Sequence, residues 1–294
     1  EGLSSIERRC GTETASALFK LSLEGVDIVR ETIDQHQLEG CAPTSGKLSV
    51  LRYDDGDNLQ RLRDRMAKEF NFEMEYLDTH AIRARLNTER YFHGLRDSHG
   101  FHFHPLNYCL GVAELIEAKG GILYENSPMI RVESQGDRHH VVTQQGVIDC
   151  GNVVHCCGGY GGPEFGRLRR AFLPIATYVV LTEHLGDRLR DTIRTTDAVG
   201  DNRRASDYYR VVDGDRLLWG GHITTRNVQD EKRLAHMLTD DILNVFPQLR
   251  GLQIEKAWSG LMGYARHKMP HIGTLGPGLW ACTSFGGQDR KSVV

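Results

Sequence analysis

The sequence of 294 residues contains no apolar run of the roughly 18 residues that a membrane-spanning helix needs, which excludes such a helix within it. The opening stretch EGLSSIERRC also lacks the apolar core of a signal peptide. Neither sign of charge is in clear excess, because 36 basic and 39 acidic residues give a formal net charge of −3. Since the basic residues are scattered, neither nucleic acid nor an anionic membrane is indicated, and the expected partner is a small molecule.

The cysteine pattern is not that of a disulfide framework. The seven cysteines are odd in number, and Cys156 and Cys157 are adjacent within an apolar run. This pattern favours reduced, buried thiols, and therefore a reducing compartment with the cytoplasm as the default expectation.

A motif that dinucleotide-binding folds normally carry is also missing. These folds have GxGxxG in their first βα unit and an acidic residue about 20 positions later, and the sequence contains no such arrangement. Instead, two glycine pairs follow apolar runs, Gly158 with Gly159 and Gly286 with Gly287. Without Cβ atoms the backbone can approach a ligand, but the spacing fits a tight turn without a ligand equally well.

Apolar periodicity predicts helices separated by many strands. Apolar residues at three- and four-residue steps indicate helices over 13–36, 57–70, 105–120 and 230–246. The runs ILYEN, MIRVES, HHVVTQ and NVVHCC are predicted strands, and NVVHCC is expected to be covered on both faces. Residues 174–221 favour a mostly antiparallel sheet with one covering helix.

Four segments in order carry a family resemblance. They are SHGFHFHPLNYCLGVAELIEAKGGILYENSPMIRVE, VIDCGNVVHCCGGYGG, DYYRVVDGDRLLWGG and WSGLMGYARHKMPHIGTLGPGLWACTSFGG. From about residue 13 to residue 288 the sequence resembles the FAD-dependent oxidoreductases of the D-amino-acid oxidase and sarcosine oxidase superfamily. Within that superfamily it is most similar to the gamma-glutamylputrescine oxidase-like branch.

The resemblance implies an α/β fold with two domains. A Rossmann-like FAD-binding domain would be built from residues 1–36, 105–165 and 270–288. An antiparallel, β-rich substrate domain would take residues 37–104 and 166–269. The strands NVVHCC and LWACTS are then expected in one sheet.

Both ends of the sequence depart from the family pattern. Family members begin with a strand, GxGxxG and a helix, so the sequence is expected to be an internal fragment whose FAD-binding domain is incomplete. Residues 289–294, DRKSVV, differ from the family's continuation and are expected to be a non-native tail. Made alone, this chain is expected neither to bind FAD tightly nor to turn over a substrate.

The resemblance also implies a cofactor site. The backbone of Met129 would face the adenine of FAD, although a core methionine on a strand is an equal alternative. A loop and a helix N-terminus near the flavin would complete the site. Some relatives attach flavin covalently through a cysteine in the region that corresponds to about 258–266, but this sequence has no cysteine between Cys157 and Cys282. FAD is therefore expected to be non-covalent there. The remaining positions carried over from the family are Cys157, Gly158, Gly286, Gly287 and Gln288.

The implied reaction is oxidation of a C–N bond in a small amine, gamma-glutamylputrescine-like, or in an amino acid. Hydride passes from the carbon beside the nitrogen to flavin, and water hydrolyses the resulting imine. Tyr209 is a candidate substrate contact. The alternative is that it is an ordinary strand residue in a segment whose side chains alternate between the two faces. Arg266 is a candidate for holding a substrate carboxylate, or it belongs to a solvated turn. The sequence identifies no catalytic residue.

The electron acceptor stays open. Sarcosine oxidases carry a lysine over the flavin that assists reaction with oxygen, and the resemblance places Leu218 or a neighbour at that position. Oxygen and another acceptor are both retained as partners.

Two alternatives come from other classes of protein. His102 and His104 lie on one face if FHFHP is a strand, and with Cys156 and Cys157 they suggest a zinc site, although CxxC spacing is absent. The second alternative is a non-catalytic protein that retains the fold for binding.

Overall fold

The structure is a computed structural model, and it describes residues 2–203 and 206–286. Among the described helices, none combines the length and the apolar composition needed to span a lipid bilayer. The helices are α1 (Leu3–Cys10), α2 (Thr12–His36), α3 (Gly56–Phe70), α4 (Thr79–Arg85), α5 (Pro105–Ala118), α6 (Gly166–Arg169), α7 (Asp187–Thr192) and α8 (Glu231–Val245). Short 3₁₀ turns are η1 (Gly158–Tyr160), η2 (Pro163–Phe165) and η3 (Pro247–Leu249).

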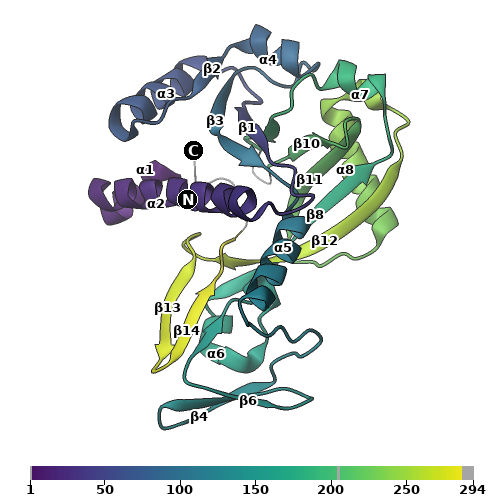
Figure 1. Cartoon of the computed structure of the whole chain (residues 1–294). Helices are drawn as coiled ribbons and strands as arrows, with labels where there is room; N and C mark the ends of the chain where they lie inside the picture. The colour runs from purple at the N-terminus through teal and green to yellow at the C-terminus, as the bar shows by residue number, and fades with distance from the viewer. Residues whose placement is uncertain (1, 204–205, 287–294) are drawn as a thin grey trace.

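Eight strands form one large sheet in the order β12-β8-β11-β10-β9-β1-β3-β2 (Figure 1). All its neighbouring strands are antiparallel except β1 and β9, which are parallel. Every strand of this sheet lies within 37–104 or 166–269. The strands are β1 (Thr44–Val50), β2 (Glu75–Leu77), β3 (Gly94–His102), β8 (Phe172–Thr182), β9 (Ala198–Asp201), β10 (Tyr208–Val212), β11 (Arg216–Thr224) and β12 (Ile254–Ala265).

Helix α8 covers one face of the large sheet, as the sequence predicts. Apolar residues at three- and four-residue steps place Leu234, Leu238 and Ile242 on the face of the helix that packs on the sheet. They join the main core, which includes the fully buried Trp219 of β11 and Tyr178 of β8. An antiparallel sheet with a single covering helix is therefore confirmed for this part of the chain.

Two smaller sheets lie below the large one in Figure 1. One has the order β13-β14-β7, with β7 (Val153–His155) parallel to β14 (Leu279–Thr283) and β13 (His271–Gly276) antiparallel to β14. The runs NVVHCC and LWACTS thus share a sheet, as expected. The other is the meander β4-β5-β6, made of Arg131–Gln135, Arg138–Val142 and Val147–Cys150.

Two strand predictions in this region are wrong. The run ILYEN (122–126) forms no strand and ends in a turn, because no neighbouring strand supplies a hydrogen-bonding ladder among the described residues. NVVHCC was expected to be covered on both faces, but within the described chain β7 pairs with β14 alone and Val154 is 58 % exposed. The apolar run therefore predicted the strand β7 correctly but not how much of it is covered by neighbouring residues.

The N-terminal helices pack on segments beyond residue 37. Phe19 of α2 meets Phe70 and Phe72 edge to face, at ring-centroid distances of 5.0 and 5.4 Å. Further along α2, the Arg30 guanidinium lies 4.6 Å from the ring centroid of Phe101 in β3 and donates a hydrogen bond to the carbonyl of His99. Helix α2 therefore borders the end of the large sheet that contains β3.

Candidate functional site

Three chain segments meet at the outer edge of β12, and we call them together the glycine junction: residues 157–160, 261–264 and 284–286. The first segment docks on the strand through Tyr160, whose hydroxyl accepts a hydrogen bond of 3.0 Å from the backbone N–H of Leu261. The third segment is held by an antiparallel bridge between Tyr264 and Phe285. The junction thus links the β13-β14-β7 sheet to the large sheet.

Glycine is required for this close contact. A Cβ added at Gly159 would lie 2.8 Å from the backbone carbon atoms of both Leu261 and Met262. A Cβ added at Gly263 would lie 3.1 Å from the Cα of Ser284. Because the opposing atoms belong to backbone, a side chain at Gly159 would force the segments apart.

Two other glycines in the junction adopt the left-handed conformation that glycine favours. Gly158 has φ of +56° and Gly286 has φ of +65°. An added Cβ at Gly158 would meet no atom within 4 Å, so open space lies beside this backbone. At Gly158, but not at Gly286, which packs on Tyr264, a ligand can approach the backbone without meeting a side chain.

The structure brings together three of the cofactor positions inferred from the sequence: Cys157, Gly158 and Gly286 all belong to the glycine junction. Partial burial raises the pKa of the Cys157 thiol above its ordinary value, and the nearby carboxylate of Glu164 raises it further. The thiol is therefore a poor nucleophile at neutral pH.

The other cofactor positions lie elsewhere. Gly287 and Gln288 fall outside the described residues. Met129 is half-buried in the loop before β4. Strand β4 belongs to the β4-β5-β6 sheet, which contributes no residue to the glycine junction. The structure therefore leaves the inferred contact of Met129 with adenine as a prediction.

The face of the large sheet opposite α8 carries polar side chains on β8 and β10. The ring of Tyr208 covers Gly220, where an added Cβ would lie 2.1 Å from the ring, and its hydroxyl is 3.5 Å from the Thr177 hydroxyl. On the same face Arg210 donates a 2.7 Å hydrogen bond to the carbonyl of Phe103. Leu218, half-buried and paired with Arg210 in register, is also on this face.

Tyr209, the candidate substrate contact, has its side chain in the main core on the α8 side. It is 2 % exposed and stacks on Trp219 with ring centroids 4.4 Å apart. Burial, together with neighbouring Tyr91, raises the pKa of the Tyr209 hydroxyl well above its ordinary value, so the phenol stays neutral. Strand alternation instead places Tyr208 on the opposite, less buried face.

Arg266 lies in an exposed turn between β12 and β13. The turn is closed by a 2.9 Å hydrogen bond from the N–H of Lys268 to the carbonyl of Ala265. Nearby, the Nε2 atoms of His267 and His271 are 3.2 Å apart. This geometry agrees with the solvated-turn alternative and leaves a carboxylate contact as a prediction.

The residues of the suggested zinc site have other roles in the structure. His102 bonds through Nε2 to the carbonyl of Thr196 at 2.8 Å, and His104 accepts a bond from the N–H of Asn107 at the start of α5. Within residues 2–203 and 206–286, no three side chains of His, Cys, Asp or Glu group closely enough to hold a metal ion.

The glycine junction lies beside the large antiparallel sheet, and the backbone at Gly158 is open to the approach of a ligand. Comparison with protein families gives the class, since residues 4–289 match the family described as FAD dependent oxidoreductase. The chain belongs to that family.

Curated relatives include named oxidoreductases. The chain is 31 % identical over 285 residues to gamma-glutamylputrescine oxidoreductase from Escherichia coli, covering 96 % of this chain and 66 % of the relative. It is 27 % identical over 294 residues to the probable oxidoreductase OrdL from Haemophilus influenzae, covering 98 % of this chain and 67 % of the relative. The chain thus spans about two thirds of the length of the curated relatives it matches.

Solved structures share the fold at low sequence identity. Glycine oxidase from Bacillus cereus superposes with a TM-score of 0.76 at 17 % identity, over 94 % of this chain and 78 % of that one. L-proline dehydrogenase from P. horikoshii gives 0.74 at 14 % identity, over 94 % and 75 % of the two chains. These likenesses establish the fold expected from the sequence.

Proposed function

We propose that the protein holds FAD non-covalently at the glycine junction and oxidises the C–N bond of a small amine, with gamma-glutamylated amines ahead of amino acids. The observation that carries the proposal is the close backbone contact of Gly159 with Leu261 and Met262, beside the open space at Gly158. Membership of an FAD-dependent family supports the choice of cofactor. The 31 % identity to gamma-glutamylputrescine oxidoreductase supports the choice of substrate.

The glycine junction suits FAD for a stated physical reason. Open space lies beside the left-handed Gly158, whereas Gly286 packs on Tyr264, so in this proposal the flavin approaches the backbone at Gly158. Backbone N–H groups directed at a flavin ring stabilise the negative charge that it acquires on reduction. In this proposal the cofactor contacts are Cys157, Gly158, Gly286, Gly287 and Gln288, and Met129 faces the adenine. When bound, FAD supplies the hydride acceptor.

The substrate would lie on the sheet face opposite α8. Tyr208 and Thr177 offer hydroxyl groups there, and the Arg210 guanidinium is fixed by the Phe103 carbonyl. We assign substrate contact to this face through Tyr208 rather than Tyr209, because the Tyr209 side chain is enclosed in the core. Arg266 is retained as a weaker candidate for a substrate carboxylate.

We further propose the domain division inferred from the sequence. The large sheet, all of whose strands lie in 37–104 and 166–269, would be the substrate domain. Residues 1–36, 105–165 and 270–288 would form the FAD-binding domain, with α2 packed on Phe70 and Phe72 of the substrate domain. The location proposed from the sequence is a reducing, cytoplasmic one, and the cysteines of the described chain are free, although Cys156 and Cys157, which were expected to be buried, are exposed.

An acceptor other than oxygen is favoured, because the resemblance places Leu218 or a neighbour at the position where sarcosine oxidases carry a lysine. A Leu218→Lys variant is expected to reoxidise faster with oxygen after reduction by substrate, because a cation near the flavin stabilises the charge transferred to oxygen. Leu218→Met, which keeps the side chain apolar, should leave the reoxidation rate unchanged. Stopped-flow absorbance of the flavin measures both.

The experiment that tests the proposed function is anaerobic mixing of the full-length protein with candidate substrates. Loss of the visible flavin absorbance is expected with gamma-glutamylputrescine, and slower or weaker loss with glycine, sarcosine or proline. Absence of bleaching with every amine and amino acid, together with bleaching by a hydroxy acid, would refute it.

A further inference from the structure

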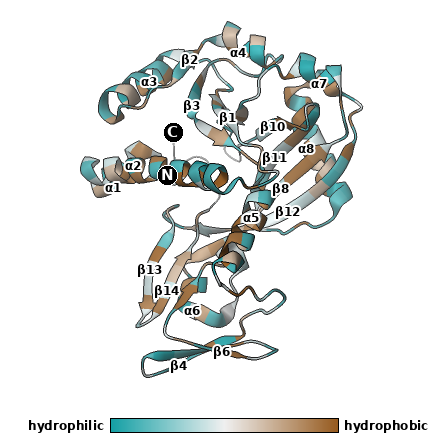
Figure 2. Ribbon diagram, viewed as in Figure 1, coloured by the Kyte–Doolittle hydropathy of each residue, from teal (hydrophilic) through white to brown (hydrophobic). Residues whose placement is uncertain are grey.

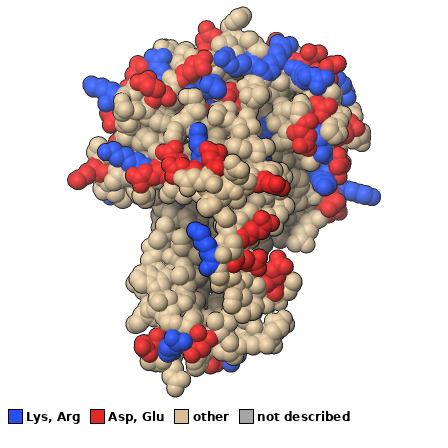
Figure 3. Space-filling model, in the orientation of Figure 1, with Lys and Arg blue, Asp and Glu red and all other residues tan. Residues whose placement is uncertain are grey.

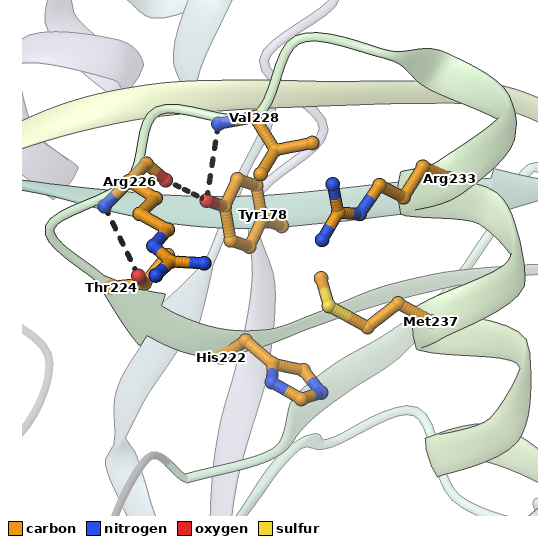
Figure 4. A pocket seen from close by; sticks show the side chains of 7 residues that line it. All are labelled: Tyr178, His222, Thr224, Arg226, Val228, Arg233 and Met237. Carbon is orange, nitrogen blue, oxygen red and sulfur yellow. Dashed lines mark hydrogen bonds between the residues drawn. The ribbon is translucent and has the colours of Figure 1, made fainter.

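A cavity of about 220 Å³ lies on the α8 side of the large sheet, away from the face assigned to the substrate. It is bounded by α8, by the middle of β8 and the end of β11, and by the loop that joins β11 to α8 (Figure 4). Its volume is below the roughly 300 Å³ at which drug-sized sites begin, so its ligand would be small. The lining residues are Tyr178, His222, Thr224, Arg226, Val228, Arg233 and Met237.

Two arginines give the cavity its charge. Arg226 reaches it from the loop and Arg233 from α8, so that the guanidinium groups approach from different elements (Figure 4). Neither guanidinium makes a hydrogen bond or an ion pair with another residue in the part of the chain that the structure describes. Guanidinium groups bind carboxylate and phosphate oxygens through paired N–H donors.

The neighbouring carboxylates are already engaged by other groups. Asp230 caps α8, its Oδ1 accepting a 3.1 Å hydrogen bond from the N–H of Arg233. Asp241 is bound by Arg203 at 2.8 Å, and the Nε2 atom of His222 lies 2.6 Å from its Oδ2. Among the described residues, neither acid forms an ion pair with Arg226 or Arg233.

Apolar groups line the cavity beside the arginines, together with the polar side chains of His222 and Thr224. The Tyr178 ring, Val228 and Met237 face the space between the two arginines (Figure 4). The Tyr178 hydroxyl donates to the carbonyl of Arg226 and accepts from the N–H of Val228 at 3.4 Å, so its hydrogen-bonding capacity is used to shape the loop. A ligand with an anionic end and a short apolar body matches this lining.

We propose that this cavity is a binding site for a small organic carboxylate, with the carboxylate between Arg226 and Arg233 and the apolar part against Met237 and Val228. The site is distinct from the glycine junction and does not depend on bound flavin. Inorganic phosphate shares the anionic chemistry but has no group to occupy the apolar part.

Isothermal titration calorimetry of the purified protein with pentanoate, phosphate and chloride at constant ionic strength tests the proposal. Saturable binding of pentanoate is expected, at least tenfold tighter than that of phosphate. The double variant Arg226→Gln, Arg233→Gln should weaken pentanoate binding at least tenfold, as expected for loss of charge-assisted hydrogen bonds. Lys232→Gln removes the same charge from α8 outside the cavity and should change affinity less than twofold.

A second variant tests the cavity itself while keeping both arginines. Val228→Phe fills part of the apolar lining and should abolish pentanoate binding without changing the circular dichroism spectrum. The proposal would be overturned by phosphate binding as tightly as pentanoate, by equal losses in the double variant and Lys232→Gln, or by unchanged binding in Val228→Phe. Absence of any saturable binding in the millimolar range would also overturn it.

Discussion

Helices α5 and α8 are of similar length and both carry apolar residues at helical spacing, but the structure buries only one of them. In α8 the residues Leu234, Leu238 and Ile242 are fully buried against the large sheet. In α5 no residue is buried, and Leu106 and Leu110 are 60 % and 55 % exposed. Apolar residues at helical spacing therefore predict both helices, whereas packing partners decide how much each contributes to stability.

The same contrast extends to the surrounding regions. The core beneath α8 is continuous across the large sheet, whereas the buried cluster around Leu168, Phe172 and Ala281 is small. Brown, apolar residues follow α5 and β14 in Figure 2. On the face shown in Figure 3, charged side chains gather over the upper part, while most of the lower part below them is tan. The large sheet and α8 thus contain most of the buried apolar core of the described chain.

The largest expected effect comes from core truncation under α8. Leu238→Ala should lower the free energy of unfolding by about 2–5 kcal/mol, because it leaves a cavity in a fully buried position. Leu110→Ala in α5 should change it by less than about 0.5 kcal/mol. Urea titration followed by circular dichroism compares the two. Equal losses would show that α5 is covered in solution.

A smaller effect is expected at the contact between the two regions. Gly159→Ala should destabilise the protein by about 1–3 kcal/mol, because the new methyl group meets the backbone of Leu261 and Met262. It should also weaken FAD binding. Gly151→Ala, where an added Cβ meets nothing within 4 Å, is the matched control and should leave stability and flavin content unchanged. If both variants behave alike, the close contact does not exist.

A third effect depends on pH. Burial alone would raise the pKa of Asp241, but hydrogen bonds from His222 and Arg203 outweigh it and lower the pKa from 3.8 to about 2. Because the folded pKa is the lower one, this carboxylate stabilises the fold above pH 4, and the contribution is lost as the pH falls through 2. Asp241→Asn should therefore reduce stability by about 2 kcal/mol at pH 6.

Denaturant titrations of the wild type and Asp241→Asn across this pH range measure the difference. It should shrink steadily below pH 4. The exposed Asp187, which pairs with Arg190 on the surface, provides the comparison, and Asp187→Asn should have little effect at any pH. A difference that stays constant down to pH 2 would contradict the assignment.

Sequence patterns predicted most of the helices and strands, but they predicted less well which segments pack against them. Periodicity predicted α2 and α8 to within about two residues, and it predicted the antiparallel strands β8, β10 and β11. It did not predict the parallel pairing of β1 with β9, which joins residues about 150 positions apart. Two predictions, a strand at ILYEN and a β7 covered on both faces, were wrong. An apolar run shows which residues favour burial, but it does not show whether a neighbouring strand or helix is there to cover them.

The candidate site was partly visible in the sequence. The glycine turn at Gly158 follows an apolar run, and that signal led to one side of the junction. Gly263 and Tyr160 were missed, because their importance comes from contacts with segments about 20 and 100 residues away. The sequence analysis chose Tyr209 in DYYRVVD as a substrate contact, because the pattern could not show that α8 covers the face of the strand that carries this tyrosine.

Hydrogen–deuterium exchange of the full-length protein with and without FAD tests the central claim, that the cofactor binds at the glycine junction. With FAD, exchange should slow in residues 157–160 and 261–264, because the ligand would restrict the backbone around Gly158. Exchange in α8 should not change. Slower exchange in α8 and the strands beneath it, with none at the junction, would contradict the account.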